Sequence, residues 1–276
     1  IQGNGATANL IQGNFIGVNA AGTGELGNGD DGVDLDSGSG VNTIGGVATG
    51  AGNLISGNAE NGITLQDSVG NEVQGNFIGT NVVGTAGLPN RGLAGIEIIA
   101  NSANNTIGGA TPSDRNIISA NSGHGVLIVD GASGNSVRGN LIGTQADGAS
   151  PLGNNNSNIH IEGSFNFIFG NTIAFSTESD TGVSVLSGTA NVIGQNSIFS
   201  NVGLGIDLGD DGVTLNDLGD ADDGPNGRHN FPVLESATGA DGILTITGFA
   251  RPMDGVELFV VDVDPTGFGE GKIFLR

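Results

Sequence analysis

The chain contains no cysteine, no tryptophan and no tyrosine, and its single lysine is Lys272. Without cysteine it can form neither a disulfide framework nor a thiolate metal site, although this absence alone does not select a cellular compartment. No apolar run approaches the ~18 residues that a membrane-spanning helix needs. We therefore expect no membrane insertion.

Basic residues are also scarce, because 7 lysines and arginines stand against 29 acidic residues and give a formal charge of −22. This excess argues against binding to nucleic acid or to an anionic membrane. It favours divalent cations or cationic partners, and its simplest explanation is a hydrated, self-repelling surface. The 53 glycines approach a low-complexity composition, but isoleucine, valine and leucine recur at fixed places, so we expect a packed core rather than disorder.

One repeated pattern accounts for most of the chain. The pattern Asn-x-(Ile/Val)-x-x-Asn-x-Ile-x-x-Asn begins at Asn9, Asn71 and Asn135, recurs with changes from Asn166 and Asn191, and is interrupted by an insertion from Asn42 and Asn105. Short alternating segments begin at Gly32, Gly62, Gly95, Gly125, Asn158, Gly182 and Gly205, at separations of 30, 33, 30, 33, 24 and 23 residues. Alternation predicts a strand, and the following asparagine-bounded segments predict two shorter strands. Each repeat is therefore expected to be one triangular coil, lengthened in places by one of two insertions.

Three apolar columns are expected to stack inside such coils, because each β-branched side chain would then meet the same neighbour above and below. The columns are Val33, Ile63, Ile96, Val126, Ile159, Val183 and Ile206; Ile11, Ile44, Val73, Ile107, Val137, Ile168 and Ile193; and Ile16, Ile55, Ile78, Ile118, Ile142, Ile173 and Ile198. A single coil cannot bury its own apolar face, whereas a stack can.

Three asparagine columns are expected to be structural, since asparagine tolerates left-handed turns and its amide can hydrogen-bond along a ladder. They are Asn9, Asn42, Asn71, Asn105, Asn135, Asn166 and Asn191; Asn14, Asn53, Asn76, Asn116, Asn140, Asn171 and Asn196; and Asn19, Asn58, Asn81, Asn121 and Asn201. The last column is broken by Gln145 and Ser176.

Several motifs resemble the right-handed parallel β-helix proteins of the pectate-lyase-like superfamily, and most closely the secreted bacterial proteins rich in asparagine and glycine. These motifs are Asn42-Thr-Ile-Gly-Gly, Asn105-Thr-Ile-Gly-Gly, Ile55-Ser-Gly-Asn and Gly75-Asn-Phe-Ile-Gly-Thr. The resemblance implies an all-β chain: a right-handed parallel β-helix of about eight coils over residues 1–230, followed by a partial β-sheet or the start of a β-sandwich over residues 231–276. In that segment we expect about three strands, near Gly242, Val256 and Lys272.

Enzymes of this superfamily that act on acidic polysaccharides carry carboxylates, basic residues and sometimes calcium on the outward face of the long strand. The weak catalytic candidates on that face are Asp34 with Asp36 and His160 with Glu162. Glycoside hydrolysis needs two carboxyl groups about 5–9.5 Å apart, which Asp34 and Asp36 could meet. A uronate lyase would also need arginine or lysine there, and the face has neither. We expect these residues to be solvated or covered by a partner.

An acidic segment is the predicted metal site, because calcium prefers six to eight oxygen ligands on a glycine-rich turn. Its candidate ligands are Asp207, Asp210, Asp211, Asp217, Asp220, Asp222 and Asp223. The spacing does not match an EF-hand, and a hydrated acidic loop is the alternative. A smaller cluster, from Asp30 to Asp36, is a weaker candidate for calcium.

The leading functional prediction is a non-enzymatic, secreted or cell-surface protein: a rigid acidic rod that serves as an adhesin, matrix component or filament subunit. Its expected partners are other copies, cell-surface or matrix proteins, or a polysaccharide, and filament contacts would use the open first coil and the C-terminal strands. The alternatives are a calcium-dependent polysaccharide lyase, hydrolase or epimerase, and a glycan-binding module using the loops at 17–28, 79–90 and 143–154. Few aromatic residues flank those loops. The chain starts inside the repeat, so we expect a mature or trimmed form.

Overall fold

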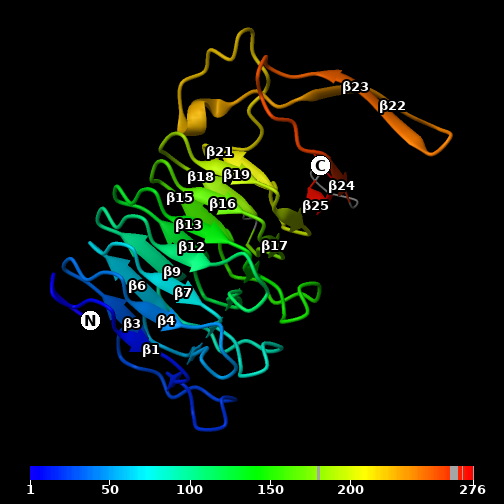
Figure 1. Cartoon of the computed structure of the whole chain (residues 1–276). Coiled ribbons are helices and arrows are strands. Elements are labelled where there is room, and N and C mark those ends of the chain that lie inside the picture. Colours follow the sequence, from blue (N-terminus) through cyan, green and yellow to red (C-terminus); the bar gives the residue numbers. More distant parts are fainter. Residues whose placement is uncertain (179–180, 262–266, 269, 276) are drawn as a thin grey trace.

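The computed structural model describes residues 1–178, 181–261, 267–268 and 270–275. These residues form a right-handed parallel β-helix followed by two antiparallel strand pairs (Figure 1). Residues 262 and 276, at the ends of two predicted strands, lie outside the described residues. The 3₁₀ helix η1 (Pro225–Arg228) is short, and no helix in the described part of the chain is long and apolar enough to cross a membrane.

Three parallel sheets, each of seven strands among the described residues, form the sides of the β-helix, and every coil gives one strand to each sheet. Sheet A contains β1 (Leu10–Ile11), β4 (Thr43–Gly45), β7 (Glu72–Gln74), β10 (Thr106–Gly108), β13 (Ser136–Arg138), β16 (Phe167–Phe169) and β19 (Val192–Gly194). Sheet B contains β2 (Phe15–Ile16), β5 (Leu54–Ile55), β8 (Phe77–Ile78), β11 (Ile117–Ile118), β14 (Leu141–Ile142), β17 (Thr172–Ala174) and β20 (Ser197–Phe199). Sheet C contains β3 (Val33–Leu35), β6 (Ile63–Gln66), β9 (Ala94–Ile99), β12 (His124–Ile128), β15 (Ile159–Ile161), β18 (Val183–Val185) and β21 (Ile206–Leu208). Gln2 pairs with Asp36 beside β3, so the seven coils are preceded by the beginning of an eighth.

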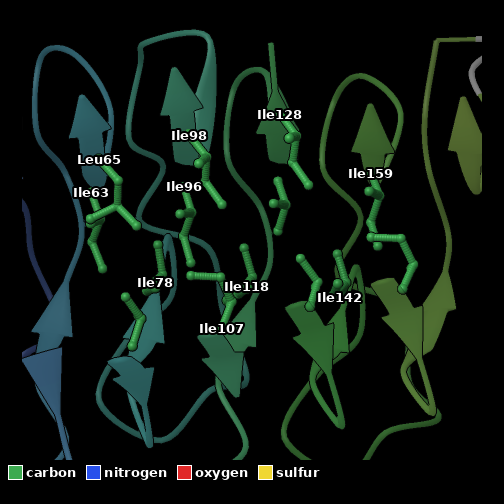
Figure 2. Close-up of a cluster of buried hydrophobic side chains, with 14 of the residues drawn as sticks. Ile63, Leu65, Ile78, Ile96, Ile98, Ile107, Ile118, Ile128, Ile142 and Ile159 are labelled. Carbon is green, nitrogen blue, oxygen red and sulfur yellow. The ribbon is translucent and has the colours of Figure 1, made fainter. Parts of the chain in front are cut away.

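The strand register confirms the three predicted apolar columns. Ile63 pairs with Ile96, for example, and Ile107 pairs with Val137. Sheet C adds a fourth inward column: Leu35, Leu65, Ile98, Ile128, Ile161, Val185 and Leu208. The central members of all four columns are fully buried, and Figure 2 shows their side chains filling the space between the sheets. The core is therefore continuous along the helix axis.

Two of the predicted asparagine columns form unbroken hydrogen-bond ladders. In the column from Asn9 to Asn191, each side-chain Nδ2 donates to Oδ1 of the asparagine one coil further on, at 2.8–3.2 Å. The column from Asn14 to Asn196 repeats this arrangement at 2.9–3.1 Å. The backbone N–H of each asparagine donates to the same Oδ1, as for Asn76 and Asn116. The ladders thus satisfy turn backbone groups that the buried corners would otherwise leave unpaired.

The third predicted column is wrong in its membership. Its ladder consists of Asn28, Asn58, Asn90, Asn121, Asn154, Asn158 and Asn201, joined at 2.8–3.0 Å. Asn19 and Asn81 instead accept hydrogen bonds inside the long insertions, from Thr23 and Thr85 among others. The reason is that each long insertion folds back on itself, so the asparagine after it, not the one before it, reaches the coil corner.

The third ladder stays continuous in the coil where Ser176 replaces the ladder asparagine, because Asn158 takes its place. Other long strands begin with glycine because the next ladder amide occupies the space: a Cβ at Gly95 would lie 2.6 Å from Nδ2 of Asn121. Ser176 is too short to fill that space, and here the strand begins with Asn158 instead of glycine. Asn158 accepts from Asn154 at 2.8 Å and donates to Asn201 at 3.0 Å.

Among its described residues the C-terminal segment has four strands, one more than predicted. β22 (Val233–Ala240) pairs with β23 (Ile243–Phe249), and β24 (Phe259–Val261) pairs with β25 (Gly271–Phe274). The β22–β23 hairpin projects away from the helix, as Figure 1 shows, whereas β25 lies against β20 of the last coil. The additional strand, β22, was missed because its sequence contains glutamate, glycine and alanine, which are weak strand formers.

The end of the last coil is closed by side chains from the C-terminal segment. Asn226, in η1, accepts from the backbone N–H of Asn191 at 2.8 Å and so extends the first ladder. Glu270 accepts from Nδ2 of Asn201 at 2.8 Å and extends the third. Glu257 accepts from the backbone N–H of Gln195 at 2.8 Å. Among the C-terminal strands, β25 therefore packs on the last coil, whereas the β22–β23 hairpin projects away from it.

Candidate functional site

The outward face of sheet C, where catalytic residues were predicted, is a packed surface. One outward column contains Asp34, Thr64, Glu97, Leu127, His160, Ser184 and Asp207, in the predicted register. From Thr64 onward every member is buried, the most exposed being Glu97 and His160 at 8%. This column is therefore buried, whereas the second outward column is half-buried or exposed: Asp36, Gln66, Ile99, Val129, Glu162, Leu186 and Gly209.

Glu97 shows how this face is held. Its Oε2 accepts a 2.8 Å hydrogen bond from Nδ2 of Asn61, which also donates to Oγ1 of Thr64 at 3.1 Å. Burial raises the pKa of Glu97, and the Asn61 hydrogen bond partly opposes that rise. Asn61 lies before β6, the strand that precedes β9 in the stack, and it meets Glu97 only because the coils are stacked. The sequence alone therefore does not reveal this contact.

Asp34 and Asp36 lie together at the first coil, as predicted, but they do not face each other across an open cleft. Asp34 is exposed, and Asp36 Oδ2 accepts from Nε2 of Gln2 at 3.1 Å. The pKa of Asp34 is raised, first by desolvation and then by the negative charges of Asp36 and Asp31. A raised pKa suits a general acid, but the outward columns of sheet C supply no arginine or lysine beside it.

His160 and Glu162 also meet as predicted, with Nε2 and Oε1 3.2 Å apart. The His160 ring also packs against His124, with ring centroids 4.8 Å apart, and His124 Nδ1 lies 3.2 Å from the Ser157 carbonyl. His160 is buried and Glu162 half-buried. The contacts of His160 with the described residues include one carboxylate, that of Glu162, whereas glycoside hydrolysis uses two carboxyl groups that flank the scissile bond.

The acidic segment from Asp207 to Asp223 is spread out, and several of its carboxylates are already engaged. Asp207 accepts from the Gly212 N–H at 3.0 Å, and Asp211 pairs with Arg228 at 2.7 Å. Asp217 accepts from the Ala221 N–H at 3.0 Å. Burial raises the pKa of Asp207, whose Oδ1 has no hydrogen-bond partner in the described protein. These contacts make the segment a folded connection between β21 and the C-terminal strands.

Asp220 belongs to a small ionic network that the sequence did not reveal. It accepts from the Asn230 N–H at 2.7 Å and pairs with Arg251, and His229 lies 3.7 Å from it. Asp254 bridges Arg251 at 3.3 Å and His229 at 3.1 Å. The Asn230 hydrogen bond and the neighbouring cations lower the pKa of Asp220. The network joins the acidic segment to the loop after β23.

Metal binding was predicted for this segment and, more weakly, for the cluster from Asp30 to Asp36. Among the described residues, no group of three or more histidine, aspartate or glutamate side chains is arranged to hold a metal ion. Asp31 in the smaller cluster accepts from the Asn61 N–H at 2.8 Å. Calcium stays a prediction. In the acidic segment from Asp207 to Asp223, the carboxylates that accept no hydrogen bond from the described residues are Asp210, Asp222 and Asp223.

The three long insertions lie side by side over the outer face of sheet B. Val82 N–H donates to Gly22 at 3.0 Å and Ala146 N–H donates to Gly84 at 2.9 Å, so successive insertions are hydrogen-bonded. They cover part of the outward apolar row Phe15, Leu54, Phe77, Ile117 and Leu141. Beside them a groove of about 450 Å³ is lined by Phe77, Ile117, Leu141 and Arg115 among others.

Two exposed apolar surfaces were missed by the sequence reasoning. The first, called the Phe patch, consists of Phe165, Phe167, Phe169 and Val192, which are 60%, 48%, 41% and 46% exposed. The second is the β22–β23 hairpin, where Leu234, Ile243, Leu244 and Phe249 are each more than 60% exposed. The signal for the Phe patch was present as phenylalanine at every second position from 165 to 169.

Comparisons with protein-family models, with curated proteins and with solved structures find no match to the chain.

Proposed function

We propose that this chain is a non-enzymatic structural or adhesive protein of an extracellular or cell surface, in which the β-helix serves as a stiff acidic rod. The observation that carries the proposal is the uniformity of the interior: three asparagine ladders and four apolar columns run through the coils. Coils at ~4.8 Å spacing make a rod of roughly 35 Å. The outward columns of sheet C carry no arginine or lysine beside the candidate carboxyls, which disfavours a uronate lyase.

Self-association is part of the proposal, with contacts through the edge strands of the first coil and through the C-terminal strands. Edge strands can accept another chain by strand addition. The C-terminal strands carry a large share of the exposed apolar side chains, including Leu234, Leu244, Phe249 and Val261. Other cell-surface or matrix proteins, or a polysaccharide, are alternative partners for the same surfaces. We further propose distant membership of the pectate-lyase-like superfamily, on the motifs and the parallel coil.

Calcium is proposed as a stabiliser of the acidic segment. Since no three acidic side chains of the described residues are arranged to hold it, the carboxylates of Asp210, Asp222 or Asp223 would bind it together with ligands from a neighbouring copy. Calcium takes oxygen ligands in flexible geometry, and these three carboxylates accept no hydrogen bond from the described residues. The proposed role is to join the segment to a neighbouring copy.

Negative-stain electron microscopy of the purified chain, with and without a calcium chelator, tests the rod and its assembly. The proposal predicts rods or regular end-to-end assemblies, and loss of assembly on chelation would assign the contact to the acidic segment. The double variant Asp222→Asn with Asp223→Asn should then behave like the chelated chain. A parallel screen against acidic and neutral glycans must show no cleavage, because turnover would refute the non-enzymatic proposal.

A further inference from the structure

The β22–β23 hairpin has one face without a polar side chain. Cross-strand pairs place residues on the same side of a two-stranded ribbon, and the pairs Leu234 with Gly248, Ala237 with Ile246 and Gly239 with Leu244 define this arm face. The opposite face carries Phe249 with Val233 and Ile243 with Ala240 at its two ends, and hydroxyl pairs at its centre, such as Ser236 with Thr247. Almost every residue of the hairpin is exposed. An isolated hairpin is marginally stable at best in water, so the arm face requires a cover.

The Phe patch is a second uncovered apolar surface, and it lies at the same end of the β-helix. Phe167 pairs with Val192 across β16 and β19, and Phe169 lies over Gly194, where a Cβ would be 3.2 Å from its ring. Phe165 has a left-handed φ of 59°, in a corner that is occupied in the other coils by Ala8, Val41, Gly70, Asn104, Gly134 and Ala190, all with positive φ. A bulky residue in that conformation is strained. The chain therefore keeps an exposed aromatic ring at a position that favours glycine.

Charges beside the two surfaces are complementary. Arg138 pairs in register with Phe169 and, among the described residues, has no carboxylate within 4.0 Å. Glu235 stands at the bulge of β22, next to Leu234, and is exposed without a hydrogen bond or ion pair. In a chain with 29 acidic and 7 basic residues, an unpaired arginine beside an aromatic patch favours an acidic occupant.

From these observations we propose that two copies of the chain exchange their hairpins, so that the arm face of each copy packs on the Phe patch of the other. Glu235 of each copy then meets Arg138 of its partner. The inference rests on the proposed self-associating rod and names its C-terminal contact. The exchange brings the arm face, the Phe patch and the two unpaired charges together in one symmetric arrangement.

The areas favour reciprocal exchange over a single contact. Two strands of seven residues present a face of roughly 23 Å by 10 Å, so one arm on one patch buries only about 450 Å² in total. Specific interfaces bury at least about 1,000 Å². Two such contacts related by a two-fold axis approach that threshold, and a closed isologous pair does not propagate. The product is a dimer of moderate affinity, with two rods joined at their C-terminal ends.

Sedimentation velocity over a wide concentration range tests the exchange, with far-UV circular dichroism as the check on folding. Leu244→Ser on the arm and Phe167→Ser on the patch should each raise the dimer dissociation constant about tenfold or more. Thr245→Ser, on the opposite face of the same strand, is the matched control and should leave it unchanged. Each copy carries a formal net charge of −22, so two copies repel one another. Added salt screens this repulsion and should not abolish the dimer.

Reversing the charges of Glu235 and Arg138 gives a more specific test of the same contact. Glu235→Arg and Arg138→Glu should each weaken the dimer, and the double variant should restore it. A monomer at every concentration would overturn the exchange and leave the rod proposal intact, since isolated rods would still be seen by microscopy. If Leu244→Ser weakens the dimer and Phe167→Ser does not, the exchange is overturned in favour of hairpin-to-hairpin pairing. A double charge variant that dimerises no more tightly than the single variants would also overturn the exchange.

Discussion

Asn81 and Asn90 provide the most decisive test of the fold, because sequence periodicity and tertiary structure disagree about which of them belongs to the third ladder. Asn90 is fully buried. Its Oδ1 accepts from the backbone N–H of Asn58 at 3.2 Å and from Nδ2 of Asn58 at 2.9 Å, and its own Nδ2 donates to Asn121. Asn81 accepts from Thr85 and Ala86 within its own insertion, near the surface.

The magnitudes follow from the groups that each substitution leaves unpaired. Asn90→Ala removes the acceptor for two buried donors of Asn58, and each unsatisfied buried group costs about 1–3 kcal/mol. We expect a loss of roughly 3–5 kcal/mol in the free energy of unfolding. Asn81→Ala loses only local loop hydrogen bonds, for which about 0.5–1 kcal/mol is expected.

Urea unfolding followed by far-UV circular dichroism measures the difference, since the chain has no tryptophan or tyrosine for fluorescence. A repeat protein can unfold in more than one step, so the transition midpoints and slopes of both variants should be compared with those of the parent chain. The reasoning is refuted if Asn81→Ala destabilises the fold as much as Asn90→Ala does. That result would return Asn81 to the ladder.

Three further predictions address the core, the buried carboxyl and calcium. Ile118→Ala, at a fully buried core position, should lower the unfolding free energy by about 2–5 kcal/mol in urea titrations, and a loss below about 1 kcal/mol would contradict the stacked core. Burial raises the pKa of Glu97 above its usual 4.5, so the folded chain binds that proton more tightly and the fold loses stability as pH rises from the unfolded-state pKa through the raised one. Glu97→Gln, which keeps an acceptor for Asn61, should therefore raise the thermal midpoint near neutral pH and lose this advantage below about pH 4.5; an equal advantage at both pH values would contradict the assignment. Calcium at millimolar concentration should raise the thermal midpoint of the parent chain reversibly, and an unchanged midpoint would dismiss the calcium proposal.

Much of the β-helix was predictable because its information is local and repeated. Strand alternation around Ile63, Ile96 and Val126 marks each long strand, and the fixed spacing of Asn71 and Asn76 marks two corners of each coil. Short insertions lengthen this spacing between Asn42 and Asn53 and between Asn105 and Asn116, but these asparagines still join the same two ladders. Two ladders and three core columns followed directly, and the fourth column is the next inward position on the same strands.

The candidate site residues were predictable in position but not in surroundings. Asp34, Asp36, His160 and Glu162 all lie on the predicted face. The partners that define their chemistry, such as His124 beside His160, come from other coils. A single sequence does not show how a loop bends. The burial of the outward column of sheet C and the wide spacing of the carboxylates in the acidic segment could therefore not be predicted.

The sequence by itself determined the coil, its core and two of its ladders, because the same short pattern recurs in every coil and marks equivalent positions even where loops of different length separate them. Tertiary structure alone decided the rest. Only the folding back of the long insertions selects Asn90 over Asn81, and only the short side chain of Ser176 in the next coil makes room for Asn158. The exposure of the hairpin and of the Phe patch also depends on the tertiary structure, because these surfaces are exposed only where no other segment packs on them. Contacts between segments that are distant in the sequence cannot be seen in a local sequence pattern.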